Sequence, residues 1–405
     1  MRTTRYAARA LALSLSLTAV GAFGVAAASS APATSAPTTT APATAGAPHA
    51  GVPAGDPVGG AQLSASGVIV NLGPGVPAPP KMPGAAYLIA DLDTGQILAA
   101  RAPHQRHLPA STLKTLTALT LIPRLDANAK IMVEPQDVRV EGTHVGILAG
   151  TAYSVRTLFQ GLLMSSGNDA AWALARANGS VAMTLAQMNA TASDLGAFDT
   201  LAKDPSGLDA PGQASSVYDL ALIGRAAMKL PDFRAYVATR SASVPGGRSS
   251  TGKMLPGFKI STHNKLIYNY KGAIGIKNGY TIAAKQTIIG AATRGGKSYI
   301  VTEMASPNGS WRPTAALLDW AFAHGSAVTP IGDLVEPGTV GGAQPASAAG
   351  GGSQQPGAPR VASGVTAPGR SGLPVLQPWV GVAGLLCALA LVGAFAARSI
   401  SRGRG

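Results

Sequence analysis

The chain has 405 residues, with 32 lysines and arginines against 18 acidic residues, so its formal net charge is +14. A positive surplus of this size suits an anionic cell envelope or a membrane surface. Cys387 is the only cysteine, which excludes a disulfide and a thiolate cluster that would bind a metal.

The first 28 residues have the pattern of a secretory signal peptide. Arg2, Arg5 and Arg9 precede an apolar run that ends in three alanines at residues 26–28, and small residues of this kind mark a cleavage site. Residues 29–83 are rich in Ala, Pro, Thr and Gly. This composition predicts a flexible or polyproline-like linker.

Residues 84–337 have the patterns of a folded domain. Residues 86–91 and 96–100 are typical of a hairpin, and residues 286–293 and 298–304 of a second one. Helical patterns fill most of residues 113–238. Helices inserted between hairpins predict an α+β domain, with an antiparallel sheet backed by helices and a mainly helical lobe.

The first chemical motif pairs Ser111 with Lys114. Ser111 follows a proline and an alanine and opens an apolar-periodic stretch that Pro123 ends, which is typical of a helix. Residues three apart on a helix face the same side, so Lys114 can reach back to the Ser111 hydroxyl. A serine becomes a good nucleophile when a neutral base removes its proton, and a buried lysine can be that base.

Two more motifs follow in a fixed order. Residues 166–168, Ser-Gly-Asn, lie between an apolar run and a helical pattern, so they should form a turn that presents a second hydroxyl and an amide. Residues 277–279, Lys-Asn-Gly, end a β-like segment at 273–276. The glycine lets a ligand lie close to the strand, and the lysine supplies positive charge for a carboxylate.

Together the three motifs resemble those of the low-molecular-mass penicillin-binding proteins, and more closely those of the serine-type D-alanyl-D-alanine carboxypeptidases. The similarity runs from about residue 86 to about residue 324 and includes the turn at residues 91–95 and the helical pattern at 317–322. The resemblance implies a β-lactamase/transpeptidase-like fold, with no cofactor and no metal in the site.

The resemblance also implies a role for each motif residue. Ser111 would be acylated, Lys114 would be its base, and Ser166 would relay a proton. The backbone N–H groups of Ser111 and Tyr280 would form the oxyanion hole. The residues expected to bind substrate are Asn168, Lys277, Asn278, Gly279 and Thr281. Asn278 departs from the family, which usually has threonine there; asparagine keeps a hydrogen-bond donor but replaces the hydroxyl with a larger amide.

The activity implied is removal of the terminal D-alanine from peptidoglycan stem peptides through an acyl-enzyme, with penicillins as inhibitors. A DD-endopeptidase, a β-lactamase and a non-catalytic peptidoglycan-binding module remain alternatives. Class A β-lactamases deacylate with a glutamate between the second and third motifs, and none of the four glutamates lies in that interval.

The C-terminal part predicts a membrane anchor. Residues 338–378 form a second Gly/Ala/Pro-rich linker, and the uncharged apolar residues 379–397 have about the length needed to cross a bilayer. Three arginines in the basic tail at residues 398–405 favour a cytoplasmic C-terminus and an extracytoplasmic domain in a single-pass protein of the cell membrane. A cleaved sorting tail is the alternative. Nucleic acid is not expected as a partner at this location.

Overall fold

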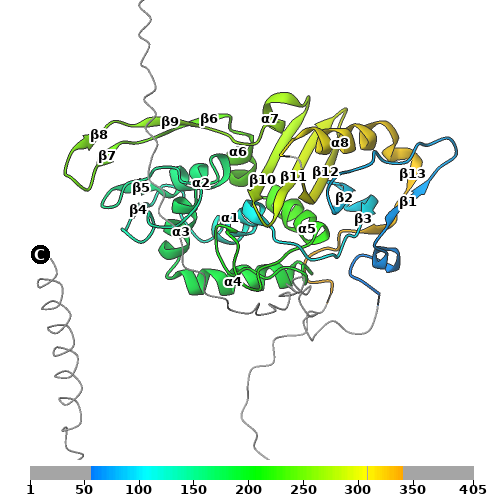
Figure 1. Cartoon of the computed structure of the whole chain (residues 1–405), viewed down its shortest axis with the longest axis horizontal. Coiled ribbons are helices and arrows are strands. Elements are labelled where there is room, and N and C mark those ends of the chain that lie inside the picture. Colours follow the sequence, from blue (N-terminus) through cyan, green and yellow to red (C-terminus); the bar gives the residue numbers. More distant parts are fainter. Residues whose placement is uncertain (1–55, 308, 341–405) are drawn as a thin grey trace, which may run out of the picture. The chain divides into compact units, whose positions relative to one another are not determined.

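The computed structural model describes residues 56–307 and 309–340, which belong to one compact unit. Its centre is an eight-stranded antiparallel sheet in the order β10-β11-β12-β2-β3-β1-β13, with β14 paired to β3 (Figure 1). The strands are β1 Val68–Leu72, β2 Ala86–Asp91, β3 Gln96–Arg101, β10 Ala273–Thr281, β11 Lys285–Arg294, β12 Lys297–Ser306, β13 Val328–Thr329 and β14 Gly332–Asp333.

Helices cover both faces of this sheet. Helix α5 (Val217–Met228) packs on one face and α8 (Arg312–His324) on the other (Figure 1). Along β2, Leu88 belongs to the core on the α5 side, whereas its neighbour Ile89 belongs to the core on the α8 side. All six residues of β2 are therefore buried, because alternate side chains point to opposite faces and each face has a helical cover.

The remaining helices form a lobe beside the β10 edge of the sheet (Figure 1). They are α1 Lys114–Leu121, α2 Val155–Met164, α3 Asn168–Ala177, α4 Val181–Asp194, α6 Pro231–Ala238 and the short α7 Leu266–Asn269. Three two-stranded sheets accompany them: β4 Lys130–Met132 with β5 Ala152–Ser154, β6 Ser241–Val244 with β9 Phe258–Ser261, and β7 Gly247–Arg248 with β8 Met254–Leu255. Serine hydroxyls cap α2, α4 and α5 by accepting a backbone N–H of the first turn.

The predicted antiparallel sheet backed by helices is confirmed, and both predicted hairpins occur as β2–β3 and β11–β12. The expected helical region 113–238 was too broad, because residues 122–154 contain β4 and β5 and residues 195–216 are irregular. The third motif lies inside β10 instead of ending a strand. Pairing with β11 carries β10 on to Thr281, which a local pattern cannot reveal.

The predicted N-terminal linker was wrong for residues 56–83. This segment contains a 3₁₀ turn at Ala61–Ser64 and strand β1, which pairs with both β3 and β13. Leu63 is 1% exposed and belongs to the main core. The run Val68-Ile69-Val70 has high β propensity, but the Pro/Gly-rich average over residues 29–83 concealed it.

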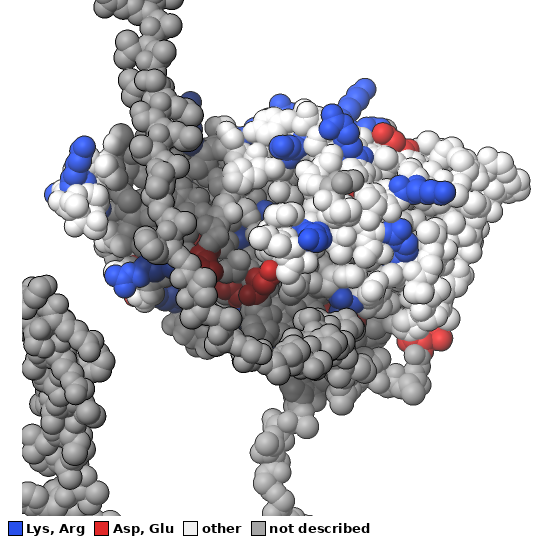
Figure 2. Space-filling model, viewed as in Figure 1, with Lys and Arg blue, Asp and Glu red and all other residues white. Residues whose placement is uncertain are grey.

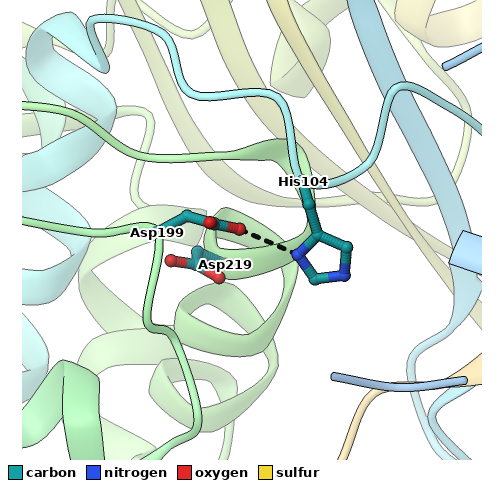
Figure 3. Close-up of side chains that lie close together, drawn as sticks. All are labelled: His104, Asp199 and Asp219. Atoms are coloured by element: carbon teal, nitrogen blue, oxygen red, sulfur yellow. Dashed lines mark hydrogen bonds and ion pairs between the residues drawn. The ribbon is translucent and has the colours of Figure 1, made fainter. Parts of the chain in front are cut away.

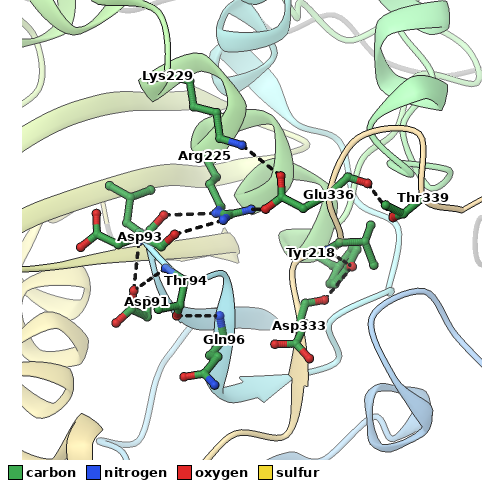
Figure 4. A network of polar contacts seen from close by, with 12 residues as sticks. Asp91, Asp93, Thr94, Gln96, Tyr218, Arg225, Lys229, Asp333, Glu336 and Thr339 are labelled. Carbon is green, nitrogen blue, oxygen red and sulfur yellow. Dashed lines mark hydrogen bonds and ion pairs between the residues drawn. The ribbon is translucent and has the colours of Figure 1, made fainter.

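The end of the described region is fastened to the β2–β3 turn. Arg225 of α5 donates to the backbone oxygens of Leu92 and Asp93, both at 3.1 Å, and forms an ion pair with Glu336 (Figure 4). Lys229 also contacts the Glu336 carboxylate, at 3.1 Å. The folded region thus reaches beyond β14, close to the predicted boundary at residue 337.

Several expectations lie outside the described residues: the signal peptide at 1–28, most of the linker at 338–378, the apolar segment at 379–397 and the basic tail at 398–405. Within residues 56–340, none of the described helices combines the length and apolar character that crossing a membrane requires. On the face that Figure 2 shows, Lys and Arg side chains are scattered and do not gather in one stripe.

Candidate active site

Ser111 lies in a tight 3₁₀ turn, Ala110–Leu113, which leads directly into α1. The turn is held from outside, because the Pro109 carbonyl accepts the Thr287 hydroxyl of β11 at 2.7 Å. Ala110 has a φ of 47°, a strained conformation for a residue with a Cβ. The α-helix expected from Ser111 onward begins at Lys114, about one turn later than predicted. Ser111 lies in the 3₁₀ turn before it, directly after the strained Ala110.

Lys114 is fully buried beneath this serine. Its Nζ lies 2.9 Å from Ser111 Oγ, and it donates to Asn168 Oδ1 and to the Ser206 carbonyl, both at 2.7 Å. Burial lowers the pKa of Lys114 well below its usual value, and the charge of Lys277 lowers it further. Nearby aspartates offset only part of this effect.

These contacts suit a base. A neutral amine has two N–H groups and one lone pair. The Asn168 amide oxygen and the Ser206 carbonyl can only accept hydrogen bonds, so they take both N–H groups. The lone pair of Lys114 is then left for the Ser111 hydroxyl. The geometry and the lowered pKa of Lys114 agree, because both favour an uncharged amine that can remove the serine proton.

Lys277 enters the same region from β10. Its side chain is 1% exposed, and burial lowers the pKa of Lys277 to about 7. Its Nζ donates to the Asn278 carbonyl at 2.5 Å. Because alternate residues of a strand face opposite sides, Asn278 does not share the face of Lys277. It lines a small pocket with His263, Lys265 and others instead.

Gly279 brings β10 into contact with the serine turn. A Cβ on this residue would lie 2.6 Å from the Ser111 nitrogen and 3.0 Å from the Thr112 nitrogen. Only glycine allows this approach. The neighbouring Tyr280 amide follows on the same strand, and its side chain is 61% exposed. The two predicted oxyanion-hole residues therefore come from elements in direct contact.

Thr281, at the end of β10, has its hydroxyl already engaged. It donates to Asp209 at 2.9 Å and accepts the Ala284 N–H, also at 2.9 Å. The hydrogen bond to Asp209 joins the end of β10 to the loop that follows Ser206.

The second motif forms the predicted turn between α2 and α3. Ser166 is 7% exposed with a φ of 62°, a second strained residue at the site. Asn168 uses its amide for support, since Nδ2 donates to the Glu141 carbonyl at 2.6 Å while Oδ1 accepts from Lys114. Its backbone N–H donates to the Thr143 carbonyl at 2.7 Å. Asn168 thus connects the base to the loop at residues 141–147.

Sequence reasoning missed two residues that support this site. Asp169 is fully buried and accepts the N–H groups of Val145 and Gly146, both at 2.9 Å. Asp204 accepts the Ser206 N–H at 2.7 Å and so helps to orient the Ser206 carbonyl that contacts Lys114. Asp169 follows the second motif directly, which was a usable signal, whereas nothing local marks Asp204 or Ser206.

A serine with a buried lysine base, set against a strand that offers a backbone amide, defines a serine acyl-transfer enzyme. The family model of the peptidase S11 D-alanyl-D-alanine carboxypeptidases matches residues 75–308, more than half of the chain. The chain belongs to this family of serine peptidases.

Individual relatives agree with this assignment. The chain is 43% identical over 251 residues to the D-alanyl-D-alanine carboxypeptidase DacB2 of Mycobacterium tuberculosis, a match that covers 60% of this chain and 84% of the relative. A crystal structure of a D-alanyl-D-alanine carboxypeptidase from M. tuberculosis H37Rv is 40% identical, with a TM-score of 0.60, covering 65% of this chain and 99% of that one. The Streptomyces K15 DD-transpeptidase is 28% identical with a TM-score of 0.58, covering 61% and 100%.

Proposed function

We propose that Ser111 is the nucleophile of this carboxypeptidase and that Lys114 is its general base. The observation that carries the proposal is the set of three contacts at Lys114 Nζ, which leaves its lone pair for the serine. Lys114 takes the proton as Ser111 Oγ bonds to the carbonyl carbon of the scissile peptide. The N–H groups of Ser111 and Tyr280 stabilise the oxyanion that forms.

The breakdown of the tetrahedral intermediate needs a proton on the leaving nitrogen. Lys114 returns the proton, with the Ser166 hydroxyl as relay, and the C-terminal D-alanine leaves as the free amino acid. Water then attacks the acyl-enzyme and gives up a proton to the same base. Lys114 passes this proton to Ser111 Oγ as the ester bond breaks, which releases the shortened peptide and restores the serine hydroxyl. Asn168 acts mainly by holding Lys114 and the loop at 141–147 in place.

The substrate we propose is a peptidoglycan stem peptide that ends in D-alanyl-D-alanine. Its terminal carboxylate suits the region of Lys277, since a bound anion favours the charged form of this buried lysine. Gly279 leaves room for the peptide along β10, and Asn278 and Thr281 border the same strand end. β-Lactams would acylate Ser111 because they present a reactive carbonyl and a carboxylate in a similar arrangement.

We further propose that the domain is exported and tethered to the cell membrane by residues 379–397, with a cytoplasmic basic tail. The N-terminal apolar run, the apolar segment at residues 379–397 and the arginines that follow it support this location.

The test is acylation of the full-length chain, solubilised in detergent, by a fluorescent penicillin. Denaturing gels and intact mass should show one adduct on the wild type and none on Ser111→Ala, which changes only a hydroxyl. Residues 250–253, Ser-Thr-Gly-Lys, repeat the Ser-x-x-Lys spacing outside the site. Ser250→Ala is therefore the matched control and should retain the adduct.

Three other results would point elsewhere. An adduct that survives Ser111→Ala would refute the assignment of the nucleophile. Rapid hydrolysis of the penicillin without a lasting adduct would favour a β-lactamase. Cleavage of cross-linked peptides to uncross-linked ones in preference to release of terminal D-alanine, in an assay with purified peptidoglycan fragments, would favour an endopeptidase.

A further inference from the structure

Three side chains that can ligate metals meet at the start of α5, outside the serine site. They are His104 from the loop before Ser111, Asp199 from the segment after α4, and Asp219 from the first turn of α5 (Figure 3). Each offers a ligand atom, and these atoms lie within 4.8 Å of one another. No sequence pattern linked them, because about 95 residues separate His104 from Asp199.

The hydrogen bonds of His104 fix which ring nitrogen is available. Nε2 lies 3.0 Å from the Val58 carbonyl, which can only accept, so Nε2 carries a hydrogen. In a neutral ring, the lone pair of Nδ1 then faces Asp199 Oδ2, only 2.8 Å away. Two lone pairs in this position repel each other unless a positive charge lies between them.

Asp219 adds a buried carboxylate to the same cluster. The residue is 1% exposed, and its Oδ2 accepts the Thr200 hydroxyl at 2.7 Å. Its Oδ1 is buried and has no hydrogen-bond partner among the described residues. An orphaned carboxylate oxygen in a buried site needs a cation or a proton.

We propose that His104 Nδ1, Asp199 and Asp219 bind one divalent transition-metal ion, with Zn²⁺ the best match. Imidazole nitrogen and carboxylate oxygen are both established zinc ligands, and zinc accepts water in a remaining position. The hydrogen bond from Nε2 to the Val58 carbonyl supplies the backbone partner that a metal-ligating histidine commonly has.

The charges and the access route fit such an ion. One dication would neutralise the two carboxylates and give Asp219 Oδ1 a partner. The His104 and Asp199 side chains are 22% and 23% exposed, so an ion and its water can reach them from solvent. Two ligands at about 2.1 Å from a tetrahedral ion lie about 3.4 Å apart. His104 Nδ1 and Asp199 Oδ2, now 2.8 Å apart, would therefore separate slightly to admit the ion, and the Asp219 ligand atom, within 4.8 Å of both, would move inward.

The ion would stabilise the fold by linking segments that are far apart in the sequence. His104 precedes the serine turn by a few residues, Asp199 follows α4, and Val58 belongs to the N-terminal segment. We therefore expect Zn²⁺ to raise the unfolding temperature by binding the folded state alone. An increase in acylation by penicillin is not required.

The experiment uses the full-length chain without a polyhistidine tag, stripped by a chelator that is then removed. Equilibrium dialysis at pH 7.5 with metal analysis should give one Zn²⁺ per chain, and the unfolding temperature should rise until one equivalent is bound. His104→Asn and Asp219→Asn should weaken Zn²⁺ binding by more than about tenfold. Mg²⁺, a poor match for imidazole, should not substitute.

Matched control variants distinguish binding at this site from non-specific Zn²⁺ binding elsewhere on the protein. His324→Asn and Asp232→Asn change residues outside the cluster and should keep one Zn²⁺ per chain. Circular dichroism establishes that each variant is folded, and Asp199→Asn replaces Asp219→Asn if burial prevents that variant from folding. The proposal fails if the wild type binds no Zn²⁺, which would leave the contact between His104 and Asp199 as a simple hydrogen bond, or if binding is unchanged in His104→Asn.

Discussion

At the scale of single residues, the site depends on two lysines that are both buried and close enough to affect each other. Burial disfavours the charge of each one, and the remaining charge on Lys277 lowers the pKa of Lys114. The two roles need opposite states, since a base must be neutral and a carboxylate partner must be charged. The surroundings of the two lysines differ: Lys114 has two acceptors and a serine around it, whereas Lys277 Nζ contacts the Asn278 carbonyl. The proposed function assigns the substrate carboxylate to Lys277.

Lys277→Met should therefore stabilise the fold while it impairs the enzyme. The folded pKa of Lys277 is about 7, against about 10.5 in the unfolded chain. Below pH 7 the lysine is charged in both states, so the folded state bears the full desolvation effect, of the order of a few kcal/mol. Between pH 7 and 10.5 the unfolded chain binds more protons, and this destabilisation fades as the pH rises.

Urea unfolding at pH 6, 8 and 10 measures this effect. The variant should be more stable than the wild type at pH 6, and the gap should narrow toward pH 10, while acylation by penicillin falls at every pH. Lys285→Met, at an exposed position on β11, is the control and should show no such pH-dependent gap. A Lys277→Met protein less stable than the wild type at pH 6 would contradict the argument.

At the scale of elements, the site is the contact between β10 and the turn that carries Ser111. The turn is anchored through Pro109 to Thr287 of β11, and Gly279 lets β10 approach the turn from the other side. The position of the nucleophile relative to the Tyr280 amide therefore depends on two neighbouring strands as well as on the local turn around Ser111.

Gly279→Ala tests this contact. The added methyl would meet the Ser111 and Thr112 nitrogens at 2.6 Å and 3.0 Å, so β10 or the turn must shift. A displacement of about 1 Å at a reacting centre costs on the order of 100-fold in rate. We expect the second-order rate of penicillin acylation to fall by about that factor, with a smaller change in stability.

Gly67→Ala is the matched control, because a Cβ there would meet nothing within 4 Å. It should acylate at the wild-type rate. Stopped-flow or quenched acylation with the fluorescent penicillin gives both rates, and equal rates for the two alanine variants would show that the close approach of β10 is unimportant.

At the scale of the whole molecule, structure set by local sequence patterns could be predicted, whereas most contacts between distant segments could not. The hairpins and the turn between α2 and α3 follow from short-range patterns, and the structure places Ser111, Lys114 and Lys277 together as the motif order suggested. The Ser206 carbonyl and the Asp169 contacts could not be predicted, because they depend on loops distant in sequence. The orientation of Asn278 away from Lys277 follows from strand alternation, once the motif is known to lie inside β10.

The N-terminal boundary of the domain is the clearest example of a feature that the sequence composition concealed. It gives a prediction about the stability of the whole domain. A fragment of residues 84–340 loses β1, which pairs with β3 and β13, together with the hydrogen bond from His104 to the Val58 carbonyl. It also loses Leu63 from the core, worth roughly 2 kcal/mol for a fully buried leucine, and exposes the edge of β3 to pairing with other chains. A fragment of residues 56–340 keeps all of these contacts.

Thermal unfolding and sedimentation compare the two fragments directly. The 56–340 fragment should be monodisperse and acylated by penicillin, whereas the 84–340 fragment should unfold several degrees lower or aggregate, because its core and its sheet edge are both open. Equal unfolding temperatures would mean that β1 and the 3₁₀ turn lie on the domain without supporting it, and that the boundary near residue 84 marks the folding unit after all.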